Sequence, residues 1–492
     1  MTKLIATFDI GTTSVKVSLF THELKQVACY VKEYSLNTNG SYVEADPSIY
    51  KEAIMLGLNQ CREAISNSVI TAIGITTQGE TLIPVDQSGT PLYPAIVWLD
   101  SRAKEQAMQL REKLSLNHFY RITGLPDISG ALPIAKIMWL QQEHPEIYAN
   151  TYKFLLLEDY ILHWLTGMFV TERTLLTSTG YFNLSTDDYW DESLQAAGID
   201  KLKLPKVLEA GSLVGILTKE AADQLELSTE TLVVTGAMDQ IASALAVGCI
   251  NPGMITETTG TALVVAACTD NPVFAQDHRV TIYRHALPGR FLYLPIGNTA
   301  GMALKWFKDE FCKDLCNEKN IYPLLDELVN TISPGSEGLL FLPFLCGSVD
   351  PENNPDAKGV FFGAQLSTNR NHFIRSIMEA IGYLLKDFLL LCERLGCKPE
   401  KIYSLGGGSR SELWQQIKAD CTGKPLTVLE ISEASSAGAA LLAAWGSGIY
   451  ERGKLPPYQV MKCYHPNPKL QELYQSQYQK YCNLYQAVKP YF

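Results

Sequence analysis

The chain has 492 residues, of which 46% are hydrophobic and 19% charged, and its formal net charge is -11. This composition excludes a disordered or fibrous protein, and an acidic balance without a concentrated Lys/Arg run excludes a general nucleic-acid binder. The length predicts two domains, because one hydrophobic core rarely serves a chain of this size.

The first residues, MTKLIATFDIG, contain no basic stretch followed by a long apolar segment. The sequence also lacks an uninterrupted apolar run of the about 18 residues that a membrane span requires. These features predict neither a secretory signal nor a membrane helix. We therefore expect a cytoplasmic protein that does not act at a membrane.

The first predicted element is a β-hairpin. Residues 4–8 are apolar and β-prone, and residues 14–20 alternate, with Val15, Val17 and Leu19 on one face. The polar run DIGTT between them has the chemistry of a turn. Two further strands are predicted at 72–76 and 82–85, joined by the polar run TQGET. Both loops place polar groups beside apolar strands.

The same design returns in the second half of the chain. A buried strand is predicted at 232–235 with Gly236 breaking it, and Asp239 stands at the entrance to a small-residue helix at 241–247. Strand-like residues 254–256 and 262–267 then enclose a second Thr/Gly tip, ETTGT. This repetition predicts two related lobes, 1–248 and 249–492.

The remaining pattern alternates helices and strands. A long amphipathic helix is predicted over 374–395, with Gly396 as its C-cap. A strand at 402–405, a glycine turn at 406–408 and a helix starting at Ser409 or Ser411 and running through Cys421 follow. The Gly/Ala-rich helix predicted at 435–444 permits close approach of another backbone. Tyrosines near helical spacing predict a C-terminal packing helix. The fold class is therefore α/β.

Three glycine-containing loops have the chemistry of phosphate binding. Phosphoryl transfer requires backbone N–H groups and hydroxyls for the phosphates, carboxylates for Mg²⁺ and a base near the acceptor hydroxyl. Asp9 with residues 11–13 fits these needs, although an ordinary Asp-initiated turn is an alternative. The second tip at 258–261 strengthens the phosphate-loop interpretation. The turn at 406–408 could lie against a nucleotide or be a tight strand-to-helix turn.

In this order, the loops resemble those of the FGGY carbohydrate kinases, members of the actin, hexokinase and heat-shock ATPase superfamily. The stretches WLDSRA, KIMWL, DAKGVFFG and ASSAGAA carry the resemblance over nearly the whole chain. It implies two ribonuclease H-like, actin-like lobes flanking a catalytic cleft, with ATP and Mg²⁺ as cofactors. Family members are often dimers, which makes a homodimer an option here.

The resemblance also implies residue roles. Asp239, in GAMDQ, matches the catalytic base, although a helix-entrance aspartate taken alone is typical of a cap. Asp9 and Asp239 would place Mg²⁺, through water. The helix at 436–440 resembles the interlobe connector. The residues implied to bind ATP are Asp9, Gly11, Thr12, Thr13 and Lys16 in the first loop, Gly260 and Thr261 in the second, and Gly407, Gly408 and Ser411 in the adenosine motif.

The substrate is harder to predict from the sequence. Glycerol kinases have Asn-Gln-Arg-Glu-Thr where this chain has TQGET, so Gly79 replaces the substrate-contacting Arg and argues against glycerol. Xylulokinases carry Gln-Met-His-Gly here, which this chain lacks, but its NPDAKGVFFG stretch is closer to theirs. For Trp98 and Arg102, a buried anchor with a structural ion pair is the alternative. The sugar-pocket candidates are Gln78, Glu80, Trp98, Asp100, Arg102, Asp239 and Gln240.

These observations predict an ATP-dependent kinase acting on a small-molecule sugar, with a ketopentose as the preferred substrate and a glycerol- or erythritol-like polyol as the alternative. A second hypothesis is a catalytically silent regulator on the same fold, which would not need Asp239 as a base. A third is a chaperone-type ATPase, which would hydrolyse ATP without a phosphorylated sugar. No nucleic-acid or membrane partner is expected.

Overall fold

The chain divides into two units in the computed structural model, which describes residues 2–63, 67–315, 321–431, 433–457 and 459–492. Unit 1 consists of residues 1–250, 281–292 and 431–457, and unit 2 of residues 251–280, 293–430 and 458–492. Two short segments from beyond position 248 therefore belong to unit 1. Among the described residues, no helix combines the length and apolar character needed to cross a membrane.

Unit 1 is built on a six-stranded mixed sheet. Its three central strands run parallel to one another, and the strands on either side of them pair in antiparallel fashion. The strand order is β14 (Leu213–Ile216), β15 (Leu232–Met238), β6 (Ser68–Thr77), β1 (Thr2–Ile10), β2 (Ser14–Thr21) and β3 (Gln26–Glu33).

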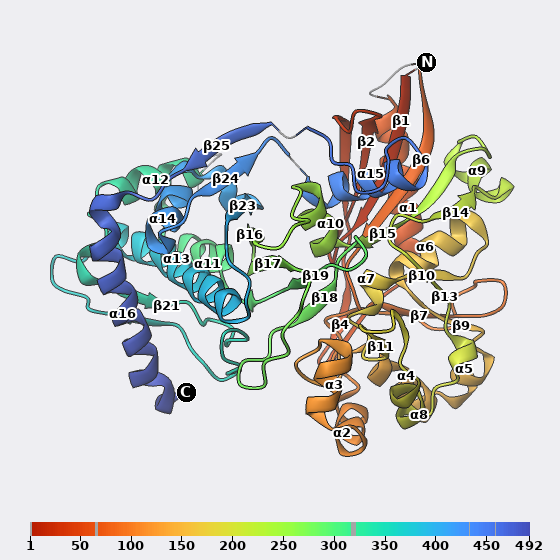
Figure 1. Ribbon diagram of the computed structural model, residues 1–492, viewed down its shortest axis with the longest axis horizontal. Helices are drawn as coiled ribbons and strands as arrows, with labels where there is room; N and C mark the ends of the chain where they lie inside the picture. The colour runs from red at the N-terminus through yellow and green to blue at the C-terminus, as the bar shows by residue number, and fades with distance from the viewer. Residues whose placement is uncertain (1, 64–66, 316–320, 432, 458) are drawn as a thin grey trace. The chain divides into compact units, whose positions relative to one another are not determined.

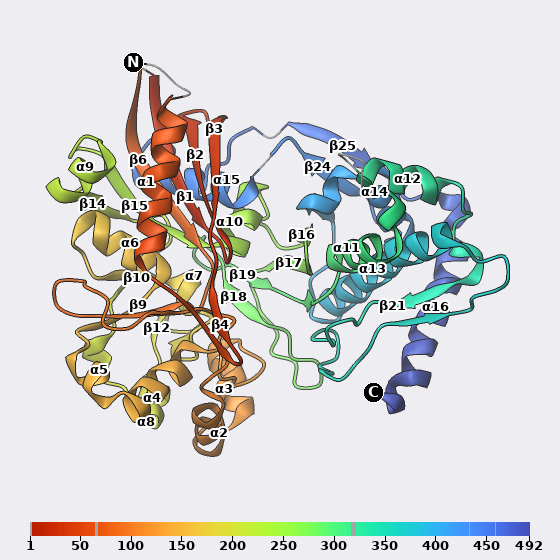
Figure 2. The same cartoon turned by 180° about the vertical axis from the view of Figure 1, so that it is seen from behind.

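Helices cover both faces of this sheet. Helix α15 (Ala434–Gly446) lies over the face seen in Figure 1, and α1 (Ser48–Glu63) lies over the opposite face, seen in Figure 2. Strand β1 is buried from Leu4 to its end, as expected for a central strand covered on both sides. The predicted apolar face of β2 is confirmed, with Val15, Val17 and Leu19 all buried.

A second layer of unit 1 contains a five-stranded sheet and several short helices. The sheet order is β4 (Asn37–Asn39), β5 (Tyr42–Ala45), β8 (Ala95–Ile96), β7 (Leu82–Val85) and β9 (Lys153–Leu156). Further helices of unit 1, of which α6 and α7 contact β15 of the six-stranded sheet, are α2 (Lys104–Lys113), α3 (Leu116–Thr123), α4 (Pro133–Glu143), α5 (Pro145–Asn150), α6 (Leu157–Thr166), α7 (Arg173–Leu176), α8 (Asp191–Ala197) and α9 (Lys219–Leu225).

Unit 2 has its own mixed sheet with helices packed against it. The long helix α13 (Arg370–Arg394) packs against α14 (Glu412–Thr422), which in turn contacts the C-terminal helix α16 (Gln471–Val488) (Figure 1). Its other α-helices are α11 (Gly301–Phe311) and α12 (Ile321–Asn330). Consecutive sheet neighbours are β17 (Leu263–Thr269), β16 (Met254–Thr259), β23 (Lys401–Leu405), β24 (Leu426–Leu429) and β25 (Val460–Tyr464).

The two units repeat one strand arrangement. In unit 1 the antiparallel hairpin β1/β2 is followed by β6, which pairs parallel to β1. In unit 2 the hairpin β16/β17 is followed by β23, which pairs parallel to β16. The predicted pair of related Thr/Gly hairpins is therefore confirmed.

One predicted strand end is wrong. The sequence pattern ended a strand at Gly236, but β15 continues to Met238. The pairing with β6 shifts register between Val234 and Ala237, which is a β-bulge. A side chain at Gly236 would place its Cβ 1.4 Å from the carbonyl oxygen of Ile75. Glycine thus allows close contact between two strands at this point, and does not end one of them.

Helix α10 (Asp239–Ala246) starts directly after β15, with Met238 at its N-cap position. Asp239 is therefore the first residue of the helix, and the alternative that it caps the helix is wrong. The predicted close approach of the Gly/Ala-rich helix is confirmed, because a Cβ at Gly438 of α15 would lie 2.0 Å from the carbonyl oxygen of Ala242 in α10.

Candidate active site

The tip of the first hairpin places Asp9 and Lys16 side by side. The two residues are direct cross-strand partners, and Lys16 Nζ lies 3.6 Å from Asp9 Oδ2. Ser435 Oγ donates to the same carboxylate oxygen at 2.6 Å, and Lys16 donates to Glu433 Oε2 at 2.7 Å. Burial raises the pKa of Asp9, and the Lys16 charge opposes this. A nearly buried carboxylate thus lies beside a partly exposed ammonium at the loop.

Hydrogen bonds to the backbone of Gly11 fix the conformation of the loop. The Gly11 N–H donates to the Ser14 carbonyl at 3.0 Å, and the Tyr34 hydroxyl donates to the Gly11 carbonyl. Thr12 Oγ1 accepts a hydrogen bond of 2.9 Å from the indole N–H of Trp98. The structure therefore brings two predicted site residues from different segments, Thr12 and Trp98, into direct contact.

Asp239 lies within the electrostatic field of two other carboxylates. Burial, the charge of Asp9 and, to a smaller extent, the charge of Glu80 together raise its pKa to about 7, while hydrogen bonds with Gln240 oppose the rise. Three predicted site residues from β1, the β6–β7 loop and α10 are thus brought together in unit 1. A carboxylate with a pKa near neutrality is suited to accept a proton.

The β6–β7 loop is strained at Glu80, whose φ of 61° is in the left-handed region. Such a conformation costs about 1–3 kcal/mol for a non-glycine residue and is concentrated at functional sites. Beside it, Gln78 is 4% exposed, and neither its Nε2 nor its Oε1 has a partner within the described residues. The Thr81 hydroxyl is likewise buried without a partner there. Such unpaired polar atoms point to a polar ligand.

Three residues near Glu80 were not predicted as site residues. The buried Lys136 Nζ donates to the carbonyls of Glu80 and Val97 at 3.0 and 2.9 Å. Burial raises the pKa of Glu80 and lowers that of Lys136, each to about 7, with each charge opposing the shift of the other. The hydroxyls of Ser178 and Tyr283 hydrogen-bond the Glu80 carboxylate. Only Lys136 carried a sequence signal, the KIMWL stretch.

Arg102 and Asp100 form a closed ion pair. Arg102 Nε and Nη2 donate to the Asp100 carboxylate, Nη2 also donates to Glu44 Oε1 at 2.7 Å, and both side chains of the Arg102–Asp100 pair are fully buried. The guanidinium carbon lies 4.0 Å from the ring centroid of Tyr42. These contacts favour the structural interpretation for Arg102 and Asp100. Trp98, by contrast, is 37% exposed.

In unit 2, the second tip lies at the start of a helix. The Gly301 N–H donates to the Gly260 carbonyl at 2.8 Å, and the Ala300 and Met302 N–H groups donate to the Thr261 carbonyl. A Cβ at Gly301 would lie 2.4 Å from the Gly260 carbonyl oxygen, so glycine is required for this approach. The N-terminus of α11 therefore adjoins the loop, and its partial positive charge favours an anion. Sequence reasoning missed Gly301.

The glycine turn after β23 packs on the same tip. Gly406 has a φ of 77°, and a Cβ on it would lie 2.8 Å from the Thr259 carbonyl oxygen. Gly407 and Gly408 begin a short 3₁₀ turn, and Gln415 Nε2 donates to the Gly408 carbonyl at 3.1 Å. Two of the three predicted loops are therefore neighbours within unit 2.

Ser411 is the N-cap of α14, one of the two predicted choices. Its hydroxyl accepts from the Trp414 N–H at 3.0 Å and donates to Asp326 Oδ2 at 2.8 Å. Both hydrogen-bonding functions of the hydroxyl are therefore engaged in fixing the helix start.

A buried ion pair stabilises the end of β16, which leads into the second tip. Lys418 Nζ lies 2.5 Å from Glu257 Oε1, and both side chains are fully buried. Lys418 also donates to Thr259 Oγ1 at 3.2 Å, and Thr259 donates to Glu257 Oε2 at 2.7 Å. Ser404 completes the network by donating to Glu257. The strand end that carries Gly260 is therefore held by a closed set of charged hydrogen bonds.

Two Thr/Gly hairpin tips on repeated α/β units, with carboxylates beside the first, define an ATP-dependent phosphotransferase of the actin-like class. The model of the FGGY family of carbohydrate kinases, N-terminal domain, matches residues 4–246, and the model of its C-terminal domain matches residues 256–447. The chain belongs to the FGGY family of carbohydrate kinases. It is a phosphotransferase that acts on an alcohol group of a sugar.

The similar proteins are named for two different substrates, gluconate and xylulose. A gluconokinase from Bacillus subtilis is 31% identical over 94% of this chain and 90% of its own length. A xylulose kinase from Lactococcus lactis is 29% identical over 97% of this chain and 95% of its own length. The crystal structure of ligand-bound xylulose kinase from Lactobacillus acidophilus superposes with a TM-score of 0.90 at 26% identity, covering 99% of this chain and 98% of that one.

Proposed function

We propose that this kinase transfers the γ-phosphate of ATP, with Mg²⁺, to a hydroxyl of a ketopentose, and that Asp239 is the general base. The observation that carries the proposal is the raised pKa of Asp239, about 7, in a group that also contains Asp9 and Glu80. A base poised near neutral pH combines a deprotonated population with useful basicity. The family relationship supports the same assignment.

In the proposed reaction, Asp239 accepts the proton of the sugar hydroxyl as that oxygen attacks the γ-phosphorus. The bond from phosphorus to the β-phosphate bridging oxygen breaks, and ADP leaves. In unit 1, Lys16 and the N–H groups of Thr12 and Thr13 would contact phosphate. In unit 2, Gly260, Thr261, Gly407 and Gly408 would contact the nucleotide. Gln78 and Glu80 would hydrogen-bond sugar hydroxyls, and Trp98 would cover an apolar sugar face.

Asp9 and Asp239 are suited to hold Mg²⁺. Both are carboxylates, the ligand type that this hard cation prefers, and the charge of Asp9 raises the pKa of Asp239. A divalent cation near both would relieve this repulsion. Mg²⁺, when bound, would offset negative charge on the transferring phosphoryl group. Removal of Mg²⁺ by a chelator is part of the activity test below.

The charges around Asp239 favour an uncharged sugar over gluconate, the second candidate that the Bacillus subtilis relative suggests. A gluconate carboxylate placed beside Glu80 and Asp239 would require a cation. Within the described part of unit 1, Arg102 is bound to Asp100 and Glu44, and Lys136 donates to the backbone carbonyls of Glu80 and Val97. Neutral hydroxyls are the better match to these carboxylates.

A coupled ADP-release screen tests the proposal. The acceptors are xylulose, ribulose, other ketoses, gluconate, glycerol and four- or five-carbon polyols, each with and without Mg²⁺. We expect the highest kcat/KM with a ketopentose and no turnover when Mg²⁺ is chelated. Preference for gluconate would overturn the substrate assignment. ADP binding without turnover on any acceptor would support the silent regulator instead.

The pH dependence of kcat/KM for the sugar follows from the state of Asp239 in the free enzyme. The base must be deprotonated, so kcat/KM should fall as the pH drops through the pKa of Asp239, which burial and Asp9 raise to about 7 and which bound Mg²⁺ would lower. In the Glu80→Gln variant the acid limb should move to lower pH, because Glu80 contributes to that rise. An acid limb that stays at the same pH in this variant would argue against Asp239 as the base. Stopped assays from pH 5 to 8, with stability checked at each pH, supply the measurement.

A further inference from the structure

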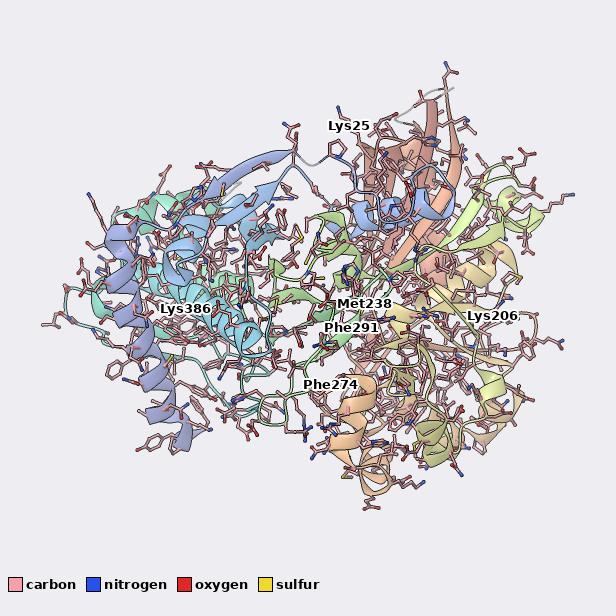
Figure 3. The ribbon with its side chains drawn as sticks, in the orientation of Figure 1. Lys25, Lys206, Met238, Phe274, Phe291 and Lys386 are labelled. Atoms are coloured by element: carbon pink, nitrogen blue, oxygen red, sulfur yellow. The ribbon has the colours of Figure 1, made fainter. Side chains whose placement is uncertain are left out.

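The backbone that leads into Asp239 is held by side chains. At the end of β15, the Gly236 N–H donates to Glu158 Oε1 at 2.7 Å, and the Met238 N–H donates to Thr174 Oγ1 at 2.9 Å. Between them, the Ala237 carbonyl accepts from Thr76 Oγ1 at 2.7 Å. Met238, labelled in Figure 3, is the residue directly before Asp239. Every one of these contacts lies within unit 1.

A β-bulge precedes this stretch of backbone. The pairing of β15 with β6 shifts register between Val234 and Ala237, so the ladder is interrupted at Thr235 and Gly236 and resumes at Ala237 and Met238. Unpaired backbone groups in a buried place cost free energy and leave the chain free to adopt other conformations. Side chains from α6, α7 and β6 bond the backbone of Gly236, Met238 and Ala237 at and directly after the bulge. Both α6 and α7 pack on β15.

Thr174 is itself oriented by Glu172, the N-cap of α7. The Thr174 hydroxyl donates to Glu172 Oε1 at 2.6 Å, and its N–H donates to Oε2 at 2.7 Å. A hydroxyl has a single proton, so donation to Glu172 leaves its lone pairs for the Met238 N–H. Thr174 and Glu172 are both fully buried. The direction of the bond to Met238 is therefore determined by the carboxylate.

Glu158 differs from Glu172 in its tendency to carry a negative charge. Burial, together with the neighbouring charges of Glu172 and Asp159, raises its pKa well above the usual value. In the neutral acid its carbonyl oxygen still accepts the Gly236 N–H, although this bond favours the charged form. Glu172, which accepts three hydrogen bonds from Thr174 and Leu175, is the better site for the negative charge.

We propose that Thr174, oriented by Glu172, is a positioning residue for phosphoryl transfer: by fixing the Met238 N–H at the end of β15, it aims the carboxylate of Asp239 at the acceptor hydroxyl. Thr174 does not touch the substrate in this proposal. The inference rests on the proposed function, in which Asp239 is the general base. Misplacement of a reacting group by about 1 Å can cost on the order of 100-fold in rate.

Thr174→Val tests this role, because valine keeps the shape of threonine and removes the acceptor for the Met238 N–H. We expect kcat on the best acceptor to fall about 10- to 100-fold, with the KM for ATP unchanged. Thr174→Ser, which keeps the hydroxyl, should restore most of kcat. Thr231→Val is the matched control, since the buried Thr231 hydroxyl donates to the Ile70 carbonyl at 3.2 Å at the opposite end of β15. The control should lose similar thermal stability and keep its kcat.

The outcomes separate the two proposals. If Asp239→Asn is inactive while Thr174→Val keeps the unmodified kcat, the positioning role is wrong and the general base stands. If Asp239→Asn keeps its activity, or if the unmodified chain turns over no acceptor, the proposed function fails and the positioning role with it. Should Thr174→Val not fold, Thr174→Ala, which also removes the acceptor for the Met238 N–H, decides the question, with a lowered kcat supporting the role and an unchanged kcat overturning it.

Discussion

Replacing Asp239 by asparagine is expected to lower kcat about 10²- to 10⁴-fold, which is the usual contribution of a general base. Asparagine keeps the size of the side chain but cannot accept the hydroxyl proton. The substitution also removes a charge that is repelled by Asp9 and Glu80, so the folded state should not be weakened. ADP binding should persist, as measured by calorimetry alongside coupled-assay turnover.

Asp387→Asn provides the control for this experiment. Burial also raises the pKa of Asp387, to about 6, but this residue belongs to α13 and accepts its hydrogen bond from Tyr478. We expect its kcat to match that of the unmodified chain. Substantial residual turnover by Asp239→Asn would remove Asp239 from the role of base. Loss of both ADP binding and turnover would instead indicate a damaged fold.

Replacing Lys418 by methionine is expected to lower the free energy of unfolding by about 3–5 kcal/mol, the typical cost of leaving one member of a buried ion pair without its partner. Methionine matches the length of the lysine stem but leaves the fully buried Glu257 carboxylate without its cation. The double variant Lys418→Met/Glu257→Gln should recover part of the loss, because no uncompensated charge remains. Urea unfolding, with hydrogen exchange in α14 to locate the change, supplies the measurement.

Lys424→Met is the matched control for Lys418→Met. Lys424 forms a 3.1 Å ion pair with Glu393 in the same unit, but both side chains are about one-third exposed. Such pairs typically contribute about 0–1 kcal/mol. Equal losses for the two variants would contradict the argument from burial. Because Lys418 also contacts Thr259, we expect a higher KM for ATP in Lys418→Met as well.

Local patterns were sufficient to predict both hairpins and the helices α13, α14, α15 and α16, but not α1. The alternation at Val15, Val17 and Leu19 predicts one buried face of a strand, and the structure confirms it. The glycines at 406 and 438 predicted tight turns and close packing, because only a missing Cβ allows such backbone approach. The family resemblance implied Asp9, Asp239 and Glu80 as site residues, but their mutual electrostatic effect depends on the folded structure.

Long-range contacts could not be read in this way. The sequence around Gly236 is typical of a strand end, yet the strand continues through it. A carbonyl of β6 approaches Gly236 closely, and the Glu158 side chain, 78 positions away, accepts its N–H. Thr174 is an unremarkable helix residue until Met238, 64 positions further on, donates to it.

The α/β class and the repeated hairpins could be predicted from short segments, because they depend on residue spacing and turn chemistry, whereas the roles of the site residues came from the resemblance to the FGGY kinases. Folding decides which buried groups meet, as with Lys418 and Glu257, which are 161 positions apart. The physical reason is that burial and charge pairing depend on neighbours brought together by folding, and these set the pKa of Asp239 and the support behind it.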